Sequence, residues 1–273
     1  MIKMFLSDGS DVIYRYPDFG SKFVLPRHVD IWLPPGYHTD STRHYPVVYM
    51  HDGQNLFDSV LAYAGVDWGM DEAITRLMGQ KLTTGAIIVG AWNTPRRLFE
   101  YMPQKPVAKL LQNFALEHEF PPESDAYLRF LAEELKPYVD STYRTHPDQA
   151  HTFVMGSSMG GLISLYALTE YPHLFGGAGC LSTHWVIGGN PLVDYFAGVL
   201  PSPSKHKLYF DYGTGELDHT YEPFQKRMDQ HMKTAGYRED QDWMSRRFEG
   251  ANHNESAWRA RVDLPLSFLL TGL

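Results

Sequence analysis

Residues 151–171 read HTFVMGSSMGGLISLYALTEY, and this stretch decides the fold. The mostly apolar residues 152–155 predict a short buried strand, and the glycine- and serine-rich residues 156–160 follow without a spacer. Leucine, isoleucine and tyrosine side chains then recur at helical spacing until Pro172, which ends the helix. A strand, a G-x-S-x-G motif and a helix in direct succession are typical of a nucleophile elbow, with Ser158 at its tip.

The elbow makes strict demands on its backbone. Because the turn is tight, we expect a side chain at Gly156 or at Gly160 to collide with the neighbouring strand and helix. The same geometry predicts a strained backbone at Ser158, which only a tightly packed setting can hold. The serine hydroxyl is then expected at the N-terminus of the following helix, where the helix dipole favours developing negative charge.

Composition excludes several classes of protein. The net charge is −8 over 273 residues with no basic cluster, which argues against nucleic-acid and anionic-membrane partners. The single cysteine, Cys180, lies in an apolar run, so we expect a buried thiol and neither a disulfide framework nor a zinc site. No apolar run is long enough for a membrane span, and Lys3 interrupts the apolar residues at the N-terminus. We therefore predict a cytoplasmic protein without a membrane span, with a secreted or periplasmic location as the alternative if a leader peptide has been removed.

Strand-like and helical segments alternate along the chain. Runs of apolar residues predict strands at 12–16, 28–33, 45–50, 85–91, 152–155, 177–181, 207–212 and 244–248. Helical periodicity or helix-start signals appear at 68–78, 124–140, 191–200 and 256–270. The alternation predicts one α/β-hydrolase domain over residues 1–273, with a doubly wound, mostly parallel sheet and helices on both faces.

Residues 92–122 break this alternation. Several prolines punctuate the segment, and only residues 107–116 suggest a helix within it. Long irregular segments in compact domains are usually functional, so we predict an active-site loop or lid over residues 92–122.

A serine nucleophile needs a base and an acid, and the order of residues along the chain selects them. On this fold the order is serine, then aspartate or glutamate, then histidine. Of the histidines after Ser158, only His253 follows the last strand and precedes the last helix, so we predict that it is the base. His184 also follows a strand, and we interpret it as a wall of the pocket.

The acid should follow the strand at residues 207–212 and precede His253. Glu216 is the favoured candidate, Asp218 is the alternative, and Asp211 within the strand is a third option. A carboxylate that is not the acid would suit a helix cap, a role that fits Asp218 well.

An oxyanion hole needs two backbone N–H donors. We expect one from Met159, directly after the nucleophile, and one from Gln54, in the polar loop after the strand at residues 45–50. The acidic residues of that loop suggest calcium, but it lacks the glycine and the closing glutamate of an EF-hand. We therefore predict no metal and no cofactor.

The remaining substrate-binding candidates are the polar and aromatic residues Asn55, Trp92, Arg97, His184 and Trp185.

Several motifs together resemble one family: residues 47–58 (VVYMHDGQNLFD), 156–161 (GSSMGG), 213–216 (GTGE) and 253–258 (HNESAW). The chain resembles the putative esterase, or esterase-D-like, family of α/β-hydrolases, which includes feruloyl and acetyl-xylan esterases, enterochelin esterases and mycolyltransferases. The resemblance implies an α/β-hydrolase fold in which Ser158 is the nucleophile, His253 the base and Glu216 the acid. It also implies that Gln54 supplies an oxyanion N–H.

These patterns predict a serine carboxylesterase that acts on a small-molecule ester through an acyl-enzyme, with a Ser-His-Glu triad. Small acyl esters and sugar or feruloyl esters are the expected substrates, since many aromatic residues lie near the predicted site. One alternative is acyl transfer to an alcohol acceptor. A second is a catalytically silent, carbohydrate-binding relative, and a third is a metal-dependent hydrolase.

Overall fold

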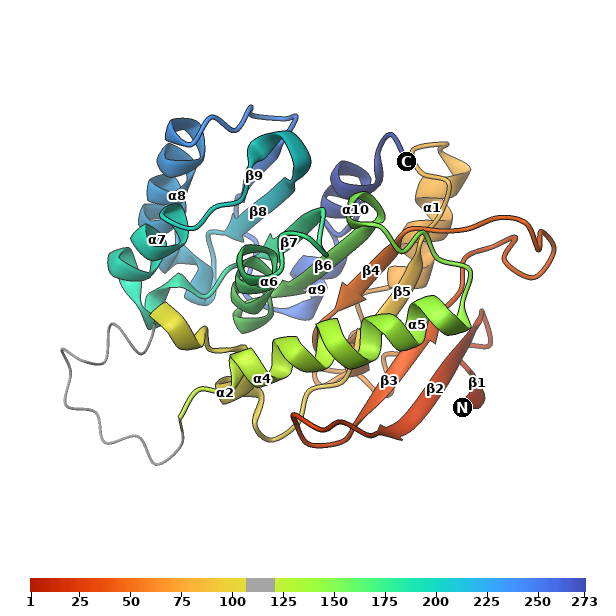
Figure 1. The fold of residues 1–273 in the computed structure, drawn as a ribbon. Coiled ribbons are helices and arrows are strands. Elements are labelled where there is room, and N and C mark those ends of the chain that lie inside the picture. The colour runs from red at the N-terminus through yellow and green to blue at the C-terminus, as the bar shows by residue number, and fades with distance from the viewer. Residues whose placement is uncertain (107–120) are drawn as a thin grey trace.

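One mixed sheet runs through the molecule (Figure 1). The computed structural model describes residues 1–106 and 121–273. Nine strands within these residues form a sheet in the order β1-β2-β3-β5-β4-β6-β7-β8-β9. Their bounds are β1 Ile2–Phe5, β2 Val12–Phe19, β3 Arg27–Trp32, β4 Val47–Met50, β5 Ile87–Ala91, β6 Thr152–Ser157, β7 Gly177–Leu181, β8 Lys207–Gly213 and β9 Trp243–Phe248.

In the order of the sheet, the six strands β5-β4-β6-β7-β8-β9 are parallel, and the strands on the N-terminal side are antiparallel. β1, β2, β3 and β5 pair antiparallel in succession, whereas β5, β4, β6, β7, β8 and β9 pair parallel. The predicted mostly parallel sheet is therefore confirmed. Strand β1 was not predicted, because it lies at the edge of the sheet with exposed side chains and carries no buried face to mark it.

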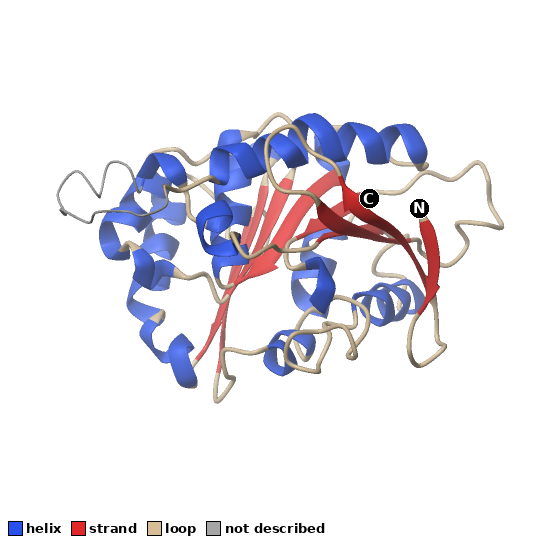
Figure 2. Ribbon diagram, turned by 90° about the horizontal axis from the view of Figure 1, so that it is seen from below, coloured by secondary structure: helices blue, strands red, loops and turns tan. Residues whose placement is uncertain are grey.

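Helices cover both faces of the sheet (Figure 2). Side chains of β4 alternate between two hydrophobic cores, with Val47 and Tyr49 in one and Val48 and Met50 in the other. The first core includes residues of α4 (Ser124–Arg129), α5 (Lys136–Thr142), α6 (Met159–Glu170), α7 (Gly189–Ala197) and α8 (Glu222–Thr234). The second includes residues of α1 (Met70–Gly79), α9 (Glu255–Arg259) and α10 (Asp263–Leu270). This is the predicted doubly wound arrangement.

Two predicted helical segments differ in detail. A π-helical stretch, Phe130–Leu135, joins α4 to α5, so residues 124–142 form one nearly continuous helical segment (Figure 1). The predicted helix at residues 256–270 is instead two short helices, α9 and α10. In the predicted lid, the short helix α2 (Arg97–Tyr101) is present, whereas the suggested helix at residues 107–116 lies outside the described residues.

Two expectations from the sequence concern the single cysteine and membrane-spanning helices. Cys180 is a free thiol and is fully buried, as predicted. Across residues 1–106 and 121–273, the helices are too short or too polar to cross a lipid bilayer.

The elbow has the predicted strained backbone, but only one of its two outer glycines is sterically required. Ser158 has φ 58° and ψ −122°, a sparsely populated conformation for a residue with a side chain. A Cβ at Gly156 would lie 2.9 Å from the carbonyl carbon of Gly160, far inside normal contact. A Cβ at Gly160 would lie 3.5 Å from its nearest neighbours, Asp52 and His51, which is ordinary contact. The predicted collision at Gly160 is therefore wrong, because α6 turns that Cβ toward the loop after β4, where there is room.

We predict that Gly156→Ala destabilises the protein and that Gly160→Ala does not. The added methyl at residue 156 forces backbone apart, which should lower the free energy of unfolding by about 1–3 kcal/mol. At residue 160, alanine has a higher helix propensity than glycine and meets no short contact, so the free energy of unfolding should change by less than about 1 kcal/mol. Urea unfolding of both variants beside the wild type measures the difference, and equal losses would contradict this account of the elbow.

Candidate active site

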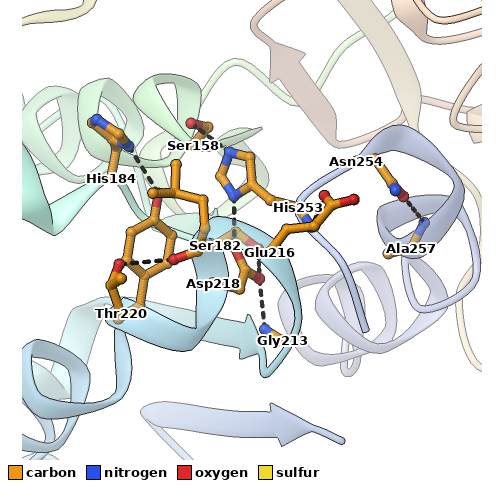
Figure 3. A network of polar contacts seen from close by, with 12 residues as sticks. Ser158, Ser182, His184, Gly213, Glu216, Asp218, Thr220, His253, Asn254 and Ala257 are labelled. Atoms are coloured by element: carbon orange, nitrogen blue, oxygen red, sulfur yellow. Dashed lines mark hydrogen bonds and ion pairs between the residues drawn. The ribbon is translucent and has the colours of Figure 1, made fainter. Parts of the chain in front are cut away.

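Ser158 and His253 meet at the carboxyl end of the sheet (Figure 3). Ser158 lies between β6 and α6, and His253 lies in the loop between β9 and α9. Their side chains are 95 residues apart in sequence, yet Ser158 Oγ is 2.9 Å from His253 Nε2. Parallel strands end at the same edge of the sheet, which is why both loops reach one point.

The carboxylate beside His253 is that of Asp218, which corrects the prediction of Glu216. Asp218 Oδ1 lies 2.5 Å from His253 Nδ1, and Asp218 is fully buried. Glu216 is exposed, and among the described residues its carboxylate accepts the backbone N–H of His253 alone, at 3.3 Å. The two residues lie in one 3-10 turn, Glu216–Thr220, which begins with a positive φ of 46° at Glu216. That turn directs Glu216 outward and Asp218 inward.

Hydrogen bonds keep Asp218 ionised. Burial alone would raise the pKa of Asp218, but donors on both carboxylate oxygens outweigh burial and lower that pKa below its ordinary value. Besides His253, the Ser182 hydroxyl donates to Oδ2 at 2.6 Å and the backbone N–H of Gly213 donates to Oδ2 at 2.6 Å. The third option for the acid, Asp211, instead forms a buried pair with Arg261 at 3.0 Å, so it does not contact the imidazole.

The predicted oxyanion loop is held in an unusual conformation after β4. Asp52 has φ 55°, and a Cβ at Gly53 would lie 2.5 Å from the backbone of Gly90. Arg97 donates to both carboxylate oxygens of Asp52, at 2.6 and 2.8 Å, and the Asn93 amide donates at 2.6 Å. Gln54 follows directly and lines the same pocket as Ser158. The oxyanion roles of Gln54 and of Met159, the first residue of α6, stay predictions.

A pocket of about 520 Å³ opens beside Ser158. The loop between β4 and α1 supplies both polar and aromatic groups to its walls. The loop after β5 adds polar groups, and α9 adds an aromatic group. The lining residues are His51, Asp52, Gln54, Asn55, Tyr63, Ala64, Trp68, Asn93, Thr94, Arg97, Ser157, Ser158, His253, Glu255 and Trp258.

Of the predicted substrate-binding residues, Asn55 and Arg97 line this pocket, whereas Trp92, His184 and Trp185 are not among its described lining residues. The Trp92 indole donates to Asp30 at 2.8 Å, and Trp185 is fully buried. Full burial contradicts the predicted pocket contact of Trp185, whereas the substrate-binding roles of Trp92 and His184 stay predictions. A side chain just after a strand can point toward the pocket or back into the packed layers, and sequence does not distinguish the two.

His184 lies behind the nucleophile instead. Its backbone N–H donates to the Ser158 carbonyl at 3.2 Å, and its Nδ1 is 2.8 Å from the Tyr221 hydroxyl. Burial, with a smaller contribution from the nearby His253, lowers the pKa of His184 to about 4. His184 is therefore neutral near pH 7 and packs against the site without carrying charge.

Sequence reasoning missed most of the aromatic wall and one acidic residue of the pocket. Tyr63 is 89% exposed in an irregular loop, so no periodic pattern indicated it. Trp68 and Trp258 pack on each other with ring centroids 5.7 Å apart. Trp258 also meets the His253 ring edge-on at 5.1 Å. Glu255 stands two residues after His253, and only that proximity could have suggested it.

His51, at the start of the loop after β4, is a structural histidine. It is buried, its Nδ1 lies 2.8 Å from the Tyr127 hydroxyl, and burial lowers its pKa to about 3. Within the described ranges, no group of three or more histidine, cysteine, aspartate or glutamate side chains is arranged to hold a metal ion.

Comparison with known families identifies the chain. The sequence model of the family described as "Putative esterase" matches residues 22–263. The chain belongs to the putative esterase family. A curated relative in Bacillus subtilis strain 168, the uncharacterized protein YbbA, is 24% identical over 234 residues, which cover 84% of this chain and 87% of YbbA. The chain is thus a carboxylic ester hydrolase, as its sequence predicts.

Solved structures share the fold. An IroE-like serine hydrolase from Shewanella oneidensis has a TM-score of 0.70 at 20% identity and covers 94% of this chain and 78% of its own. A ferulic acid esterase has a TM-score of 0.68 at 17% identity and covers 94% of this chain and 97% of its own. At these identities the likeness supports the α/β-hydrolase fold.

We predict that Asp218→Asn lowers kcat/KM by about 10³- to 10⁴-fold, because an amide in this position favours the wrong imidazole tautomer. Glu216→Gln is the matched control from the same turn. It should change kcat/KM by less than about threefold, since its carboxylate reaches only a backbone N–H at an exposed site. Steady-state kinetics on p-nitrophenyl acetate measures both, and a larger loss for Glu216→Gln would reverse the assignment.

Proposed function

We propose that the chain is a serine carboxylesterase with Ser158 as nucleophile, His253 as base and Asp218 as acid. The observation that carries the proposal is the continuous row of side chains from Ser158 Oγ through His253 to Asp218, with contacts of 2.9 and 2.5 Å. Such a row activates a serine that is otherwise a weak nucleophile. The strained elbow supports it by holding the hydroxyl out at the start of α6.

The reaction follows from this geometry. Ser158 Oγ attacks the ester carbonyl carbon while its proton passes to His253 Nε2, and the negatively charged Asp218 stabilises the imidazolium that forms. The imidazolium then gives its proton to the departing alcohol oxygen, and the acyl group remains on Ser158. Water repeats the same proton transfers and releases the acid. Backbone N–H groups of Met159 and Gln54 would bind the oxyanion in both steps.

The pocket supports small, polar or aromatic esters. Asn55, Asn93 and Thr94 line the pocket together with the aromatic rings of Tyr63, Trp68 and Trp258, and this mixture suits a substrate that combines polar groups with a ring. Tyr63 presents a nearly fully exposed ring at the pocket, where it can stack on a sugar or an aryl ring. The similar fold of a ferulic acid esterase agrees with an ester of an aromatic acid.

The charge of the pocket disfavours anionic esters. Arg97 is already engaged by both carboxylate oxygens of Asp52, so these two charges compensate each other. Glu255 also lines the pocket, where its carboxylate helps to raise the pKa of Arg97, a guanidinium that Asp52 already pairs. The uncompensated charge of the described pocket walls is therefore negative.

We predict that Ser158→Ala abolishes hydrolysis of p-nitrophenyl acetate, with kcat reduced at least about 10⁴-fold, because the variant loses the hydroxyl that contacts His253 Nε2. Labelling with a fluorophosphonate should modify the wild type and not the variant. Residual activity above about a hundredth of wild type would overturn the nucleophile, and wild-type protein that fails to label would favour the silent relative. Added alcohol acceptors during turnover, followed by product analysis, distinguish transfer from hydrolysis.

We further predict that Glu255→Gln raises kcat/KM for an anionic ester by about three- to tenfold, because the repulsion by one nearby charge disappears. The measurement pairs p-nitrophenyl hemisuccinate with p-nitrophenyl butyrate, which are of similar length and differ in charge. The neutral ester should change by less than about twofold. Equal changes for both esters would contradict the assigned charge.

A further inference from the structure

We propose that Ser182 is a positioning residue that holds the Asp218 carboxylate as a permanent hydrogen-bond acceptor toward His253. This inference rests on the proposed serine esterase function. Ser182 directly follows β7 and is fully buried. It is not among the described lining residues of the pocket, and its hydroxyl donates to Asp218, so it acts on His253 through that carboxylate.

The Ser182 hydroxyl joins three separate parts of the chain. It donates to Asp218 Oδ2 at 2.6 Å, in the loop after β8. It accepts from Trp258 Nε1 at 3.0 Å, on α9, and from Arg261 Nη2 at 2.9 Å, in the segment between α9 and α10. One oxygen atom therefore ties the triad acid to the C-terminal helices.

The chemistry of these partners fixes the direction of the Ser182 hydrogen. A serine hydroxyl has one hydrogen to donate and two lone pairs that accept. Tryptophan and arginine side chains can only donate, so Trp258 and Arg261 occupy both lone pairs. The single hydrogen must then point to Asp218.

Asp218 is thereby surrounded by donors. Its Oδ2 accepts from the Ser182 hydroxyl and from the backbone N–H of Gly213, and its Oδ1 faces His253 Nδ1. A proton on Oδ2 would be directed at two hydrogens, so the carboxylate remains charged. Because Oδ1 accepts, His253 carries its hydrogen on Nδ1, and its Nε2 is free to accept from Ser158.

Buried charges around Ser182 are balanced so that the triad acid keeps its own charge. Arg261 donates twice to Asp211, at 3.0 and 3.1 Å, and lies 3.9 Å from Asp218. Asp211 compensates Arg261, which leaves the charge of Asp218 to stabilise the imidazolium. Among the described residues, the charged or titratable groups around Asp218 and His253 are Arg261, Asp211, Glu216, Tyr221 and His184, and across the pocket Glu255, Asp52, Arg97 and His51.

The backbone of Ser182 indicates a position with a special requirement. Its φ is 43°, in the left-handed region that favours glycine, yet the residue carries a hydroxymethyl group. Its N–H donates to the Asp211 carbonyl at 2.9 Å, which holds this turn against β8. Strain of this kind persists where the surrounding structure compensates for it, and here the three hydrogen bonds of the side chain do so.

The test is the pH profile of kcat/KM for Ser182→Ala on p-nitrophenyl acetate. The loss of a donor to the carboxylate makes the Asp218–His253 pair hold a proton more tightly, so the acid limb should move to higher pH, by about half a unit to one unit. At the pH optimum, kcat should fall about tenfold. A purely structural role would lower activity at every pH without moving the limb.

Two further variants control the test. Ser182→Gly removes the same hydroxyl but relieves the positive φ, so it should fold well and show the same shift of the acid limb. Thr183→Val removes a neighbouring buried hydroxyl that donates to the Cys180 carbonyl. The acid limb of the pH profile of this variant should stay at the wild-type pH. If both Ser182 variants keep the wild-type limb while Ser158→Ala is inactive, the positioning role is overturned and the esterase assignment stands. If Ser158→Ala stays active, the esterase assignment itself fails.

Discussion

The strained backbone of Ser158 is possible only because β6 and α6 are packed on every side. β6 is paired with β4 on one edge and β7 on the other, and almost every residue of α6 is buried. The elbow also closes on itself, since the Gly156 backbone leaves no room for a Cβ beside Gly160. The backbone conformation of Ser158 is unfavourable by itself. It is nevertheless the one of lowest free energy here, because any other conformation would disrupt the two hydrophobic cores.

The same device recurs at neighbouring strand ends. Asp52 after β4, Ser158 after β6, Ser182 after β7 and Glu216 after β8 all have positive φ without being glycine. Each sharp reversal aims a polar group at one small volume at the carboxyl edge of the sheet. Asp52 brings Gln54 to the pocket, and the turn that starts at Glu216 brings Asp218 to the imidazole. The sheet thus fixes the positions of the strand ends, and the strained turns after them orient the polar groups.

Electrostatics around the site follows a consistent pattern of pairing. Arg97 compensates Asp52 at the pocket, and Arg261 compensates Asp211 beneath it. Asp218 is held by hydrogen bonds and left free to oppose a developing positive charge on His253. Histidines outside the row, His51 and His184, have pKa values lowered by burial, so they stay neutral. In the proposed reaction, the charge that forms is therefore confined to His253 and the substrate.

Sequence alone determined the elements of the fold and two residues of the site. Apolar runs and helical spacing are local properties, so the alternation of strands and helices and the elbow at Ser158 could be predicted. Chain order and strand ends were enough to select His253. The choice between Glu216 and Asp218, two residues apart in one loop, depended on a single positive φ and on which carboxylate met buried donors. The directions of Trp92 and Trp185 were likewise decided by packing. Such choices belong to tertiary structure because they depend on side chains that lie far away in the sequence.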